Sequence, residues 1–183
     1  GTGVLTLNGD LEMNNNRNAT GNTNREVFIT GTGTYATSTP SGTLDLGGAV
    51  RTFTINSNNV QANNGATIET VIQSGGIIKA GSTALLLRNA NTFTGGLTVQ
   101  EGLVDFSADD QLGGGANVIT LDGGGVSYNN NVPGTLARTL NIGSNGGIIG
   151  VAQTGGPLTQ DTADQLISTG ATTMTKSGAG PLI

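Results

Sequence analysis

The chain has 183 residues with 32 Gly and neither Cys nor His, which excludes disulfides, thiolate metal sites and the commonest general base. Its formal net charge is −5, and its seven Lys and Arg residues stand singly, so no basic stripe could follow nucleic-acid phosphates. No apolar run approaches the about 20 residues that a membrane-spanning helix needs.

Gly, Asn and Thr make up roughly two fifths of the chain, and because they are poor helix formers we expect short strands and turns. The best helical candidate, 161–168, is interpreted as strand or loop, with a short helical turn as the alternative. The expected strands, in chain order, are 4–7, 27–34, two strands within 43–55 broken at Gly47-Gly48, 67–72, 77–79, 85–87, 97–99, 103–106, 117–122, 126–128, 135–142, 148–151, 165–168 and 172–176. Loops are expected at 12–25, 35–42, 56–65, 107–115 and 154–163.

The segment 85–106 organises the chain, because three short apolar runs alternate there with turn residues. The runs are too short for helices and suit strands. Gly95-Gly96 and Gly102 should supply the turns. A strand–turn–strand–turn–strand unit of about 22 residues corresponds to one coil of a β-solenoid. The residues expected to form its core are Leu85, Leu87, Leu97, Val99, Leu103, Val104 and Phe106.

This segment resembles the autotransporter-associated β-strand repeat, most specifically at Thr92-Phe93-Thr94-Gly95-Gly96. The opening of that repeat recurs at Lys176-Ser177-Gly178-Ala179-Gly180, and weaker copies begin at Lys79 and Gly1. The close match covers about a third of the chain. The resemblance implies a right-handed, single-stranded parallel β-helix in the secreted passenger of a bacterial surface protein, and it implies no catalytic residue.

The sequence also contains a repeat that is longer than a single coil. Residues 51–58 resemble 138–145, and 71–79 resemble 166–176, at offsets of roughly 90 to 100 residues. We therefore predict one continuous solenoid, 1–183, with long units at roughly 1–84 and 85–181, as a fragment of a longer repeat protein. Coils of about 20 to 25 residues predict about eight coils and a rod of about 40 Å.

Five Asp residues could serve a carbohydrate-active β-helix enzyme, which needs carboxylates clustered on one face. They are Asp109, Asp110, Asp122, Asp161 and Asp164. The simpler interpretation is that Asp stabilises turns by bonding its own backbone. Asp109 and Asp110 could also form a weak calcium site with backbone carbonyls. The prediction is that the chain has no catalytic, cofactor-binding or metal-binding residue.

Threonine and asparagine patterns leave two further alternatives open. Thr30, Thr32 and Thr34, Thr52 and Thr54, and Thr92 and Thr94 each share a strand face, and a regular array would suggest ice binding; strand propensity explains them equally. Asn runs could stack as amide ladders between coils, or serve turns. These runs are 14–16, 58–59, 63–64 and 129–131.

The leading hypothesis is a non-enzymatic, secreted or cell-surface β-solenoid that serves as a stalk or adhesive passenger segment. The alternatives are a polysaccharide lyase or hydrolase that uses Asp residues, and an ice-binding solenoid. No polar capping unit is visible in the sequence, so the expected partners are adjacent repeats or other copies, bound through open solenoid ends that could build fibres. Surface glycans are a further expected partner; a cofactor, nucleic acid and a membrane span in this segment are not expected.

Overall fold

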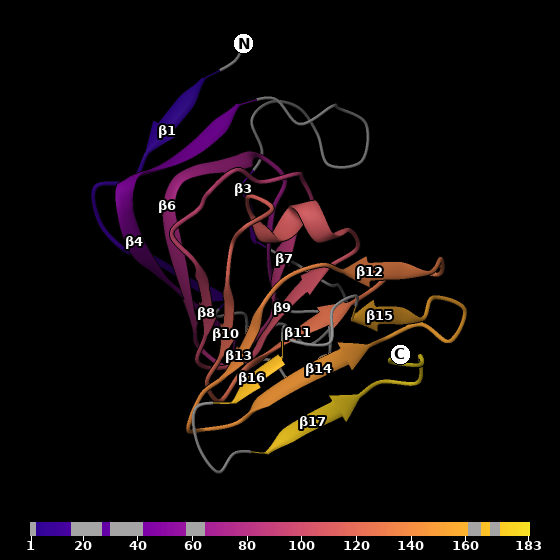
Figure 1. The fold of residues 1–183 in the computed structure, drawn as a ribbon. Coiled ribbons are helices and arrows are strands. Elements are labelled where there is room, and N and C mark those ends of the chain that lie inside the picture. Colours follow the sequence, from indigo (N-terminus) through magenta and orange to yellow (C-terminus); the bar gives the residue numbers. More distant parts are fainter. Residues whose placement is uncertain (1–2, 16–26, 30–41, 58–64, 161–165, 169–172) are drawn as a thin grey trace, which may run out of the picture.

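A computed structural model of the chain describes residues 3–15, 27–29, 42–57, 65–160, 166–168 and 173–183. This part is a β-solenoid in which every strand pair is parallel, as predicted (Figure 1). Thr, Val, Ile and Leu dominate the strands, which suits a half-buried pleated surface.

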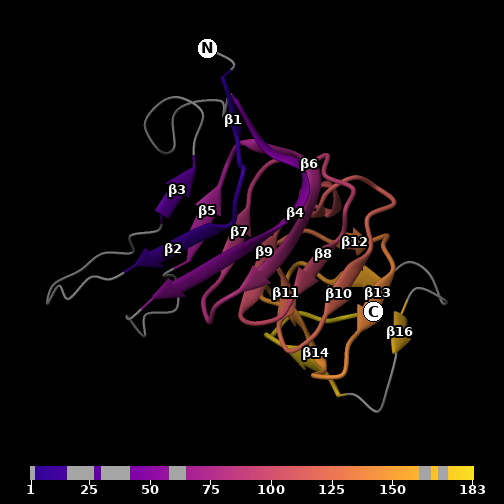
Figure 2. The same cartoon turned by 90° about the vertical axis from the view of Figure 1, so that its left-hand side faces the viewer.

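Two large sheets form the walls of the solenoid, and the chain passes from one to the other in each coil (Figure 2). The first sheet contains β1 (Val4–Thr6), β2 (Leu11–Asn15), β4 (Thr43–Ser57), β6 (Val71–Ala80), β8 (Leu97–Val99), β10 (Ile119–Leu121), β13 (Leu140–Ile142) and β16 (Leu166–Ser168). The second contains β3 (Val27–Ile29), β5 (Ala66–Ile68), β7 (Leu85–Leu87), β9 (Leu103–Phe106), β11 (Gly125–Tyr128), β14 (Gly147–Val151) and β17 (Met174–Ser177).

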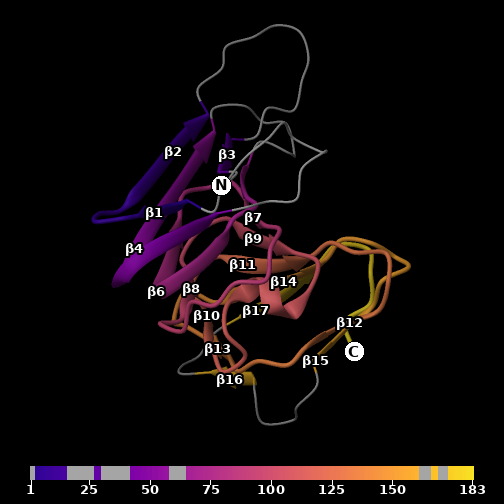
Figure 3. The same ribbon diagram turned by 90° about the horizontal axis from the view of Figure 1, so that it is seen from above.

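A small third sheet pairs β12 (Gly134–Leu136) with β15 (Leu158–Gln160), to one side of the large sheets (Figure 3). The helical element η1 (Asp109–Leu112) is a single 3₁₀ turn inside the expected loop 107–115. Within 161–168, interpreted as strand or loop, residues 166–168 form the strand β16, and 161–165 lies outside the described residues.

The solenoid has about five turns, so the prediction of about eight coils is wrong. The register advances by 20 residues from β6 to β8 and by 22 from β8 to β10, which agrees with the predicted coil length. It advances by 39 residues from β1 to β4 and by 26 from β13 to β16. The outer coils carry long polar segments between their strands. The predicted number of coils was too high because these segments were counted as coils.

Residues that pair from coil to coil form a row across a sheet, and rows that point inward make the core. One inner row of the first sheet contains Ile77, Leu97, Ile119 and Leu140, all buried. The predicted core residues are buried with one exception, Leu103, which is half-buried. In β9 the alternation places Val104 and Phe106 inward, so Leu103 lies on the outer face.

The strands β4 and β6 continue through glycine positions where breaks were predicted. In β4, Gly47 and Gly48 have φ of 68° and 73°, and the pairing with β6 shifts register between Asp45 and Ala49. In β6, Ser74 and Gly75 have φ of 58° and 144°. These positions are bulges, which bend a strand without ending it. The expected breaks at Gly47-Gly48 and within 71–79 are therefore corrected to two long, bent strands.

The predicted strand 135–142 is two strands, β12 and β13, separated by a corner at 137–139. Leu136, Arg138 and Leu140 are all buried, so the alternation of inward and outward residues persists around the corner. For that reason, the sequence pattern did not reveal the corner between β12 and β13. Part of the expected loop 154–163 is β15, which pairs with β12.

Candidate interaction surfaces at the ends of the solenoid

The Asp residues proposed for catalysis or calcium binding are spread over turns. The Asp109 carboxylate accepts hydrogen bonds from Arg138 Nε at 2.9 Å and from the Ala137 N–H at 3.2 Å. Asp122 Oδ1 accepts from the backbone N–H of Asn145 at 2.9 Å and from its side-chain amide at 3.0 Å. Both carboxylates therefore bind groups of the next coil rather than their own backbone, so the simpler interpretation is wrong in that detail.

Asp110 is exposed, and Asp161 and Asp164 lie outside the described residues. Across the described ranges, no three or more Asp and Glu side chains gather as a metal site would require. Nor does any helix in those ranges have the length and apolar character needed to cross a membrane.

Arg138 is a buried cation that the sequence patterns did not single out. Its side chain is 1% exposed. Besides the Asp109 carboxylate, the guanidinium donates to the carbonyl oxygens of Asp109 at 2.6 Å, Gly113 at 3.0 Å and Gly114 at 2.7 Å. It thus clamps η1 and the turn after it against the next coil. The sequence signal for its burial was its position, because Arg138 alternates with the inward residues Leu136 and Leu140.

Asparagine contacts between coils occur, though at few of the predicted positions. Asn56 Nδ2 donates to Asn14 Oδ1 at 3.4 Å, and these residues pair between β2 and β4. Asn129 Nδ2 donates to Asp105 at 3.3 Å, and Gln153 Nε2 donates to Asn129 at 3.2 Å. The runs 58–59 and 63–64 lie outside the described residues.

Two buried asparagines that were not predicted as ladder members tie neighbouring corners together. Asn91 accepts from the Ile72 N–H at 2.7 Å and donates to the Gln111 carbonyl at 2.6 Å. Asn117 accepts from the Gly96 N–H at 2.8 Å and donates to the Leu112 carbonyl at 2.9 Å.

The threonine pairs do not form one array in the described residues. Thr52 faces outward from β4, in a row with Ile78, Thr98, Thr120 and Asn141. The row therefore mixes residue types. Thr54 is on the same face of β4, whereas Thr92 and Thr94 lie between strands, and Thr30, Thr32 and Thr34 lie outside the described residues.

Lys79 is fully buried at 0% exposure, in an inner row between Phe53 and Val99. Its ammonium donates to the carbonyl oxygens of Ala80 at 2.7 Å, Gly81 at 2.6 Å and Glu101 at 3.1 Å. Burial lowers the pKa of Lys79 to about 8, and the charge of Glu101 opposes that shift. The carbonyl of Glu101 belongs to the following coil, so the lysine joins two coils.

β1 and β17 are edge strands at the two ends of the solenoid (Figure 1), and inner rows of side chains become exposed to solvent at both ends. In the first sheet Leu5 pairs with Leu44, which is 1% exposed, yet Leu5 is 57% exposed. At the other end Leu166 pairs with Leu140, which is 0% exposed, yet Leu166 is 46% exposed. Six of the nine exposed large apolar side chains in the described part lie in these end coils: Val4, Leu5, Leu166, Ile167, Met174 and Ile183.

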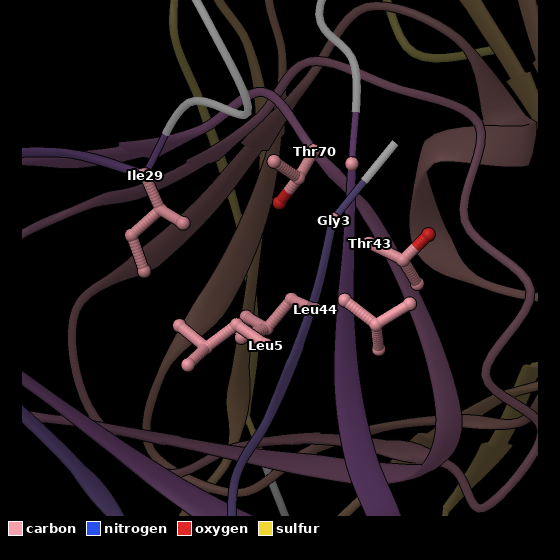
Figure 4. Close-up of a pocket in the computed structure, with 8 residues that line it drawn as sticks. Gly3, Leu5, Ile29, Thr43, Leu44 and Thr70 are labelled. Carbon is pink, nitrogen blue, oxygen red and sulfur yellow. The ribbon is translucent and has the colours of Figure 1, made fainter. Parts of the chain in front are cut away.

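A hollow of about 230 Å³ opens beside β1, between the first strands of the two sheets (Figure 4). Thr70 lines it, and the Thr70 hydroxyl oxygen turns toward the space between Ile29 and Leu5. Thr70 is 5% exposed, and its hydroxyl has no hydrogen-bond partner in the described structure. The hollow is lined by Gly3, Val4, Leu5, Ile29, Gly42, Thr43, Leu44 and Thr70.

The fold defines the chain as a parallel β-solenoid. Comparisons with models of protein families, with curated proteins and with solved structures found no match.

Proposed function

We propose that this chain is a non-enzymatic structural segment of a secreted or cell-surface bacterial protein, a stalk or passenger of the autotransporter-associated β-strand repeat type. The resemblance at 85–102 supports the family, and that segment forms two strands of the solenoid, β7 and β8. We take the solenoid to be right-handed, since crossovers between parallel strands are right-handed in about 98% of cases.

The observation that carries the proposal is the exposure of core-type residues at both end faces. An inner row is stable when each side chain is covered by the coils on either side. Leu5 and Leu166 continue rows that are buried elsewhere, but each is covered on one side only within the described structure. The edge strands also present backbone groups ready to pair with another strand. Adjacent repeats or other copies of the chain fit these faces.

The described residues favour the enzymatic alternative less, because Asp109 and Asp122 are engaged in hydrogen bonds to the next coil. The ice-binding alternative is favoured less too, because Ile78 and Asn141 interrupt the outer row of threonines.

Sedimentation velocity over a wide concentration range, with electron microscopy of the same samples, tests the proposal. We expect elongated particles that lengthen as concentration rises. A Leu5→Glu, Leu166→Glu variant should remain monomeric, because each end would then bury an unpaired carboxylate on stacking. Val132→Glu is the matched control, since Val132 is 55% exposed in a turn away from both end strands. A compact monomer at every concentration would overturn end-to-end stacking and leave the side faces as the remaining candidate interaction surfaces.

A further inference from the structure

The chain has only two lysines, and both begin the same local sequence, Lys-x-Gly. Each is followed two residues later by a glycine with positive φ, 79° at Gly81 and 76° at Gly178. The Lys79 ammonium donates to the Gly81 carbonyl, and the Lys176 ammonium donates to the Gly178 carbonyl. The recurring Lys-x-Gly sequence is therefore a local motif in which lysine binds the turn that ends its strand.

Both lysines also lie in inner rows, although in different sheets. Lys79 pairs with Val99 in the first sheet, and Lys176 pairs with Ile149 in the second. Val99 and Ile149 are buried. An inner row normally holds apolar side chains, so a lysine there needs acceptors for its ammonium.

The two lysines differ in what covers them. The coil that follows Lys79 supplies the Glu101 carbonyl at 3.1 Å from Nζ, and it packs so closely that a Cβ on Gly102 would lie 3.0 Å from Nζ. Lys176 is exposed, and no strand of the described residues stacks on the open edge of β17. Lys176 thus has the motif of Lys79 without the coil that completes it.

We propose that Lys176 is a docking residue, whose ammonium binds a main-chain carbonyl of a second copy stacked head to tail on the β16–β17 face. This inference rests on the stacking function proposed above. All strands are parallel, so the β16–β17 edge of one copy and the edge formed by β1 and β3 of another are the faces that continue the two sheets without reversal. The face with β1 offers the uncovered Leu5 and the apolar hollow beside it, opposite the uncovered Leu166 and Met174.

Acylation of amines with an N-hydroxysuccinimide ester, mapped by mass spectrometry of peptides, tests this proposal. Lys79 should remain unmodified at every protein concentration, as an internal control for folding. Lys176 should be modified readily in the monomer, and we expect its rate to fall about tenfold or more in samples that sedimentation shows to be assembled. Lys176→Met, which keeps the apolar stem and removes the donor, should weaken association about tenfold or more, the effect of losing one charged hydrogen bond.

The outcomes separate the two proposals. Assembly in which Lys176 stays as reactive as in the monomer, or equal assembly of Lys176→Met and the wild type, would overturn the role of Lys176 and leave end-to-end stacking intact. Absence of assembly at all concentrations would overturn both. Circular dichroism of Lys176→Met should match the wild type, because the side chain is exposed in the monomer.

Discussion

Replacement of Arg138 by Met should destabilise the solenoid far more than replacement of Arg88 by Met. Both arginines form an ion pair with an aspartate of a neighbouring coil, at 2.9 Å to Asp109 and 2.8 Å to Asp105. The side chain of Arg138 is 1% exposed and that of Arg88 is 29% exposed. The two substitutions therefore remove the same chemical group from a buried and from a partly hydrated site.

The magnitude follows from what each arginine leaves behind. Without Arg138, four carbonyl groups, on Asp109, Leu112, Gly113 and Gly114, lose a charged donor together with the Asp109 carboxylate. Breaking a buried ion pair from one side costs about 3 to 5 kcal/mol, and the partial exposure of Asp109 argues for about 3 kcal/mol. The Arg88 pair, screened by solvent, should contribute about 1 kcal/mol or less.

Urea denaturation followed by circular dichroism, with linear extrapolation, measures both changes in the free energy of unfolding. A loss for Arg138→Met within about 1 kcal/mol of that for Arg88→Met would refute the reasoning. It would mean that η1 and its turn find other donors, and that the guanidinium does not clamp the corner.

Two further predictions concern Lys79 and Gly102. The folded-state pKa of Lys79, about 8, lies below its ordinary value of 10.5, so between these values the unfolded chain binds more protons and stability rises with pH. From pH 7 to about pH 9.5 the wild type should gain about 2 kcal/mol relative to Lys79→Met, and parallel stability–pH curves for the two proteins would contradict the assignment. Gly102→Ala should cost about 2 kcal/mol or more, because φ is 66° and the new Cβ would lie 2.5 Å from the Thr83 carbonyl oxygen. Gly115→Ala, with open space around it, should be nearly neutral, and thermal melts of the two variants measure the difference.

The sequence predicted the strands best where apolar runs were short and bounded by turn residues. β7, β8 and β9 begin and end at the predicted residues, because Gly95-Gly96 and Gly102 leave little freedom in where the turns fall. Burial in β9 was predicted less well. Its four residues include three apolar ones, and only the stacking of coils decides that Val104 points inward and Leu103 outward.

The buried charged residues that join neighbouring coils were harder to predict, for a physical reason. Strand periodicity predicts an apolar side chain at each inward position. A lysine or arginine at such a position counts as a break in the pattern and is not predicted to be buried. Lys79 and Arg138 satisfy their charges with backbone carbonyls of a neighbouring coil, and those partners are set by stacking. The Lys-x-Gly sequence is a recurring feature of the chain, but the sequence alone does not show the hydrogen bond from the lysine to the turn carbonyl.

The unequal length of the coils has a consequence for how this molecule can change. The step from β6 to β8 takes 20 residues and the step from β13 to β16 takes 26, yet strand pairing is parallel and in register in both. Extra residues are therefore absorbed at the corners, where lengthening a loop costs free energy only slowly. Insertions and grafted peptides can enter at a corner such as Gly115 while the inner rows keep their neighbours. Such a scaffold can acquire new recognition loops while the packing of its core stays unchanged.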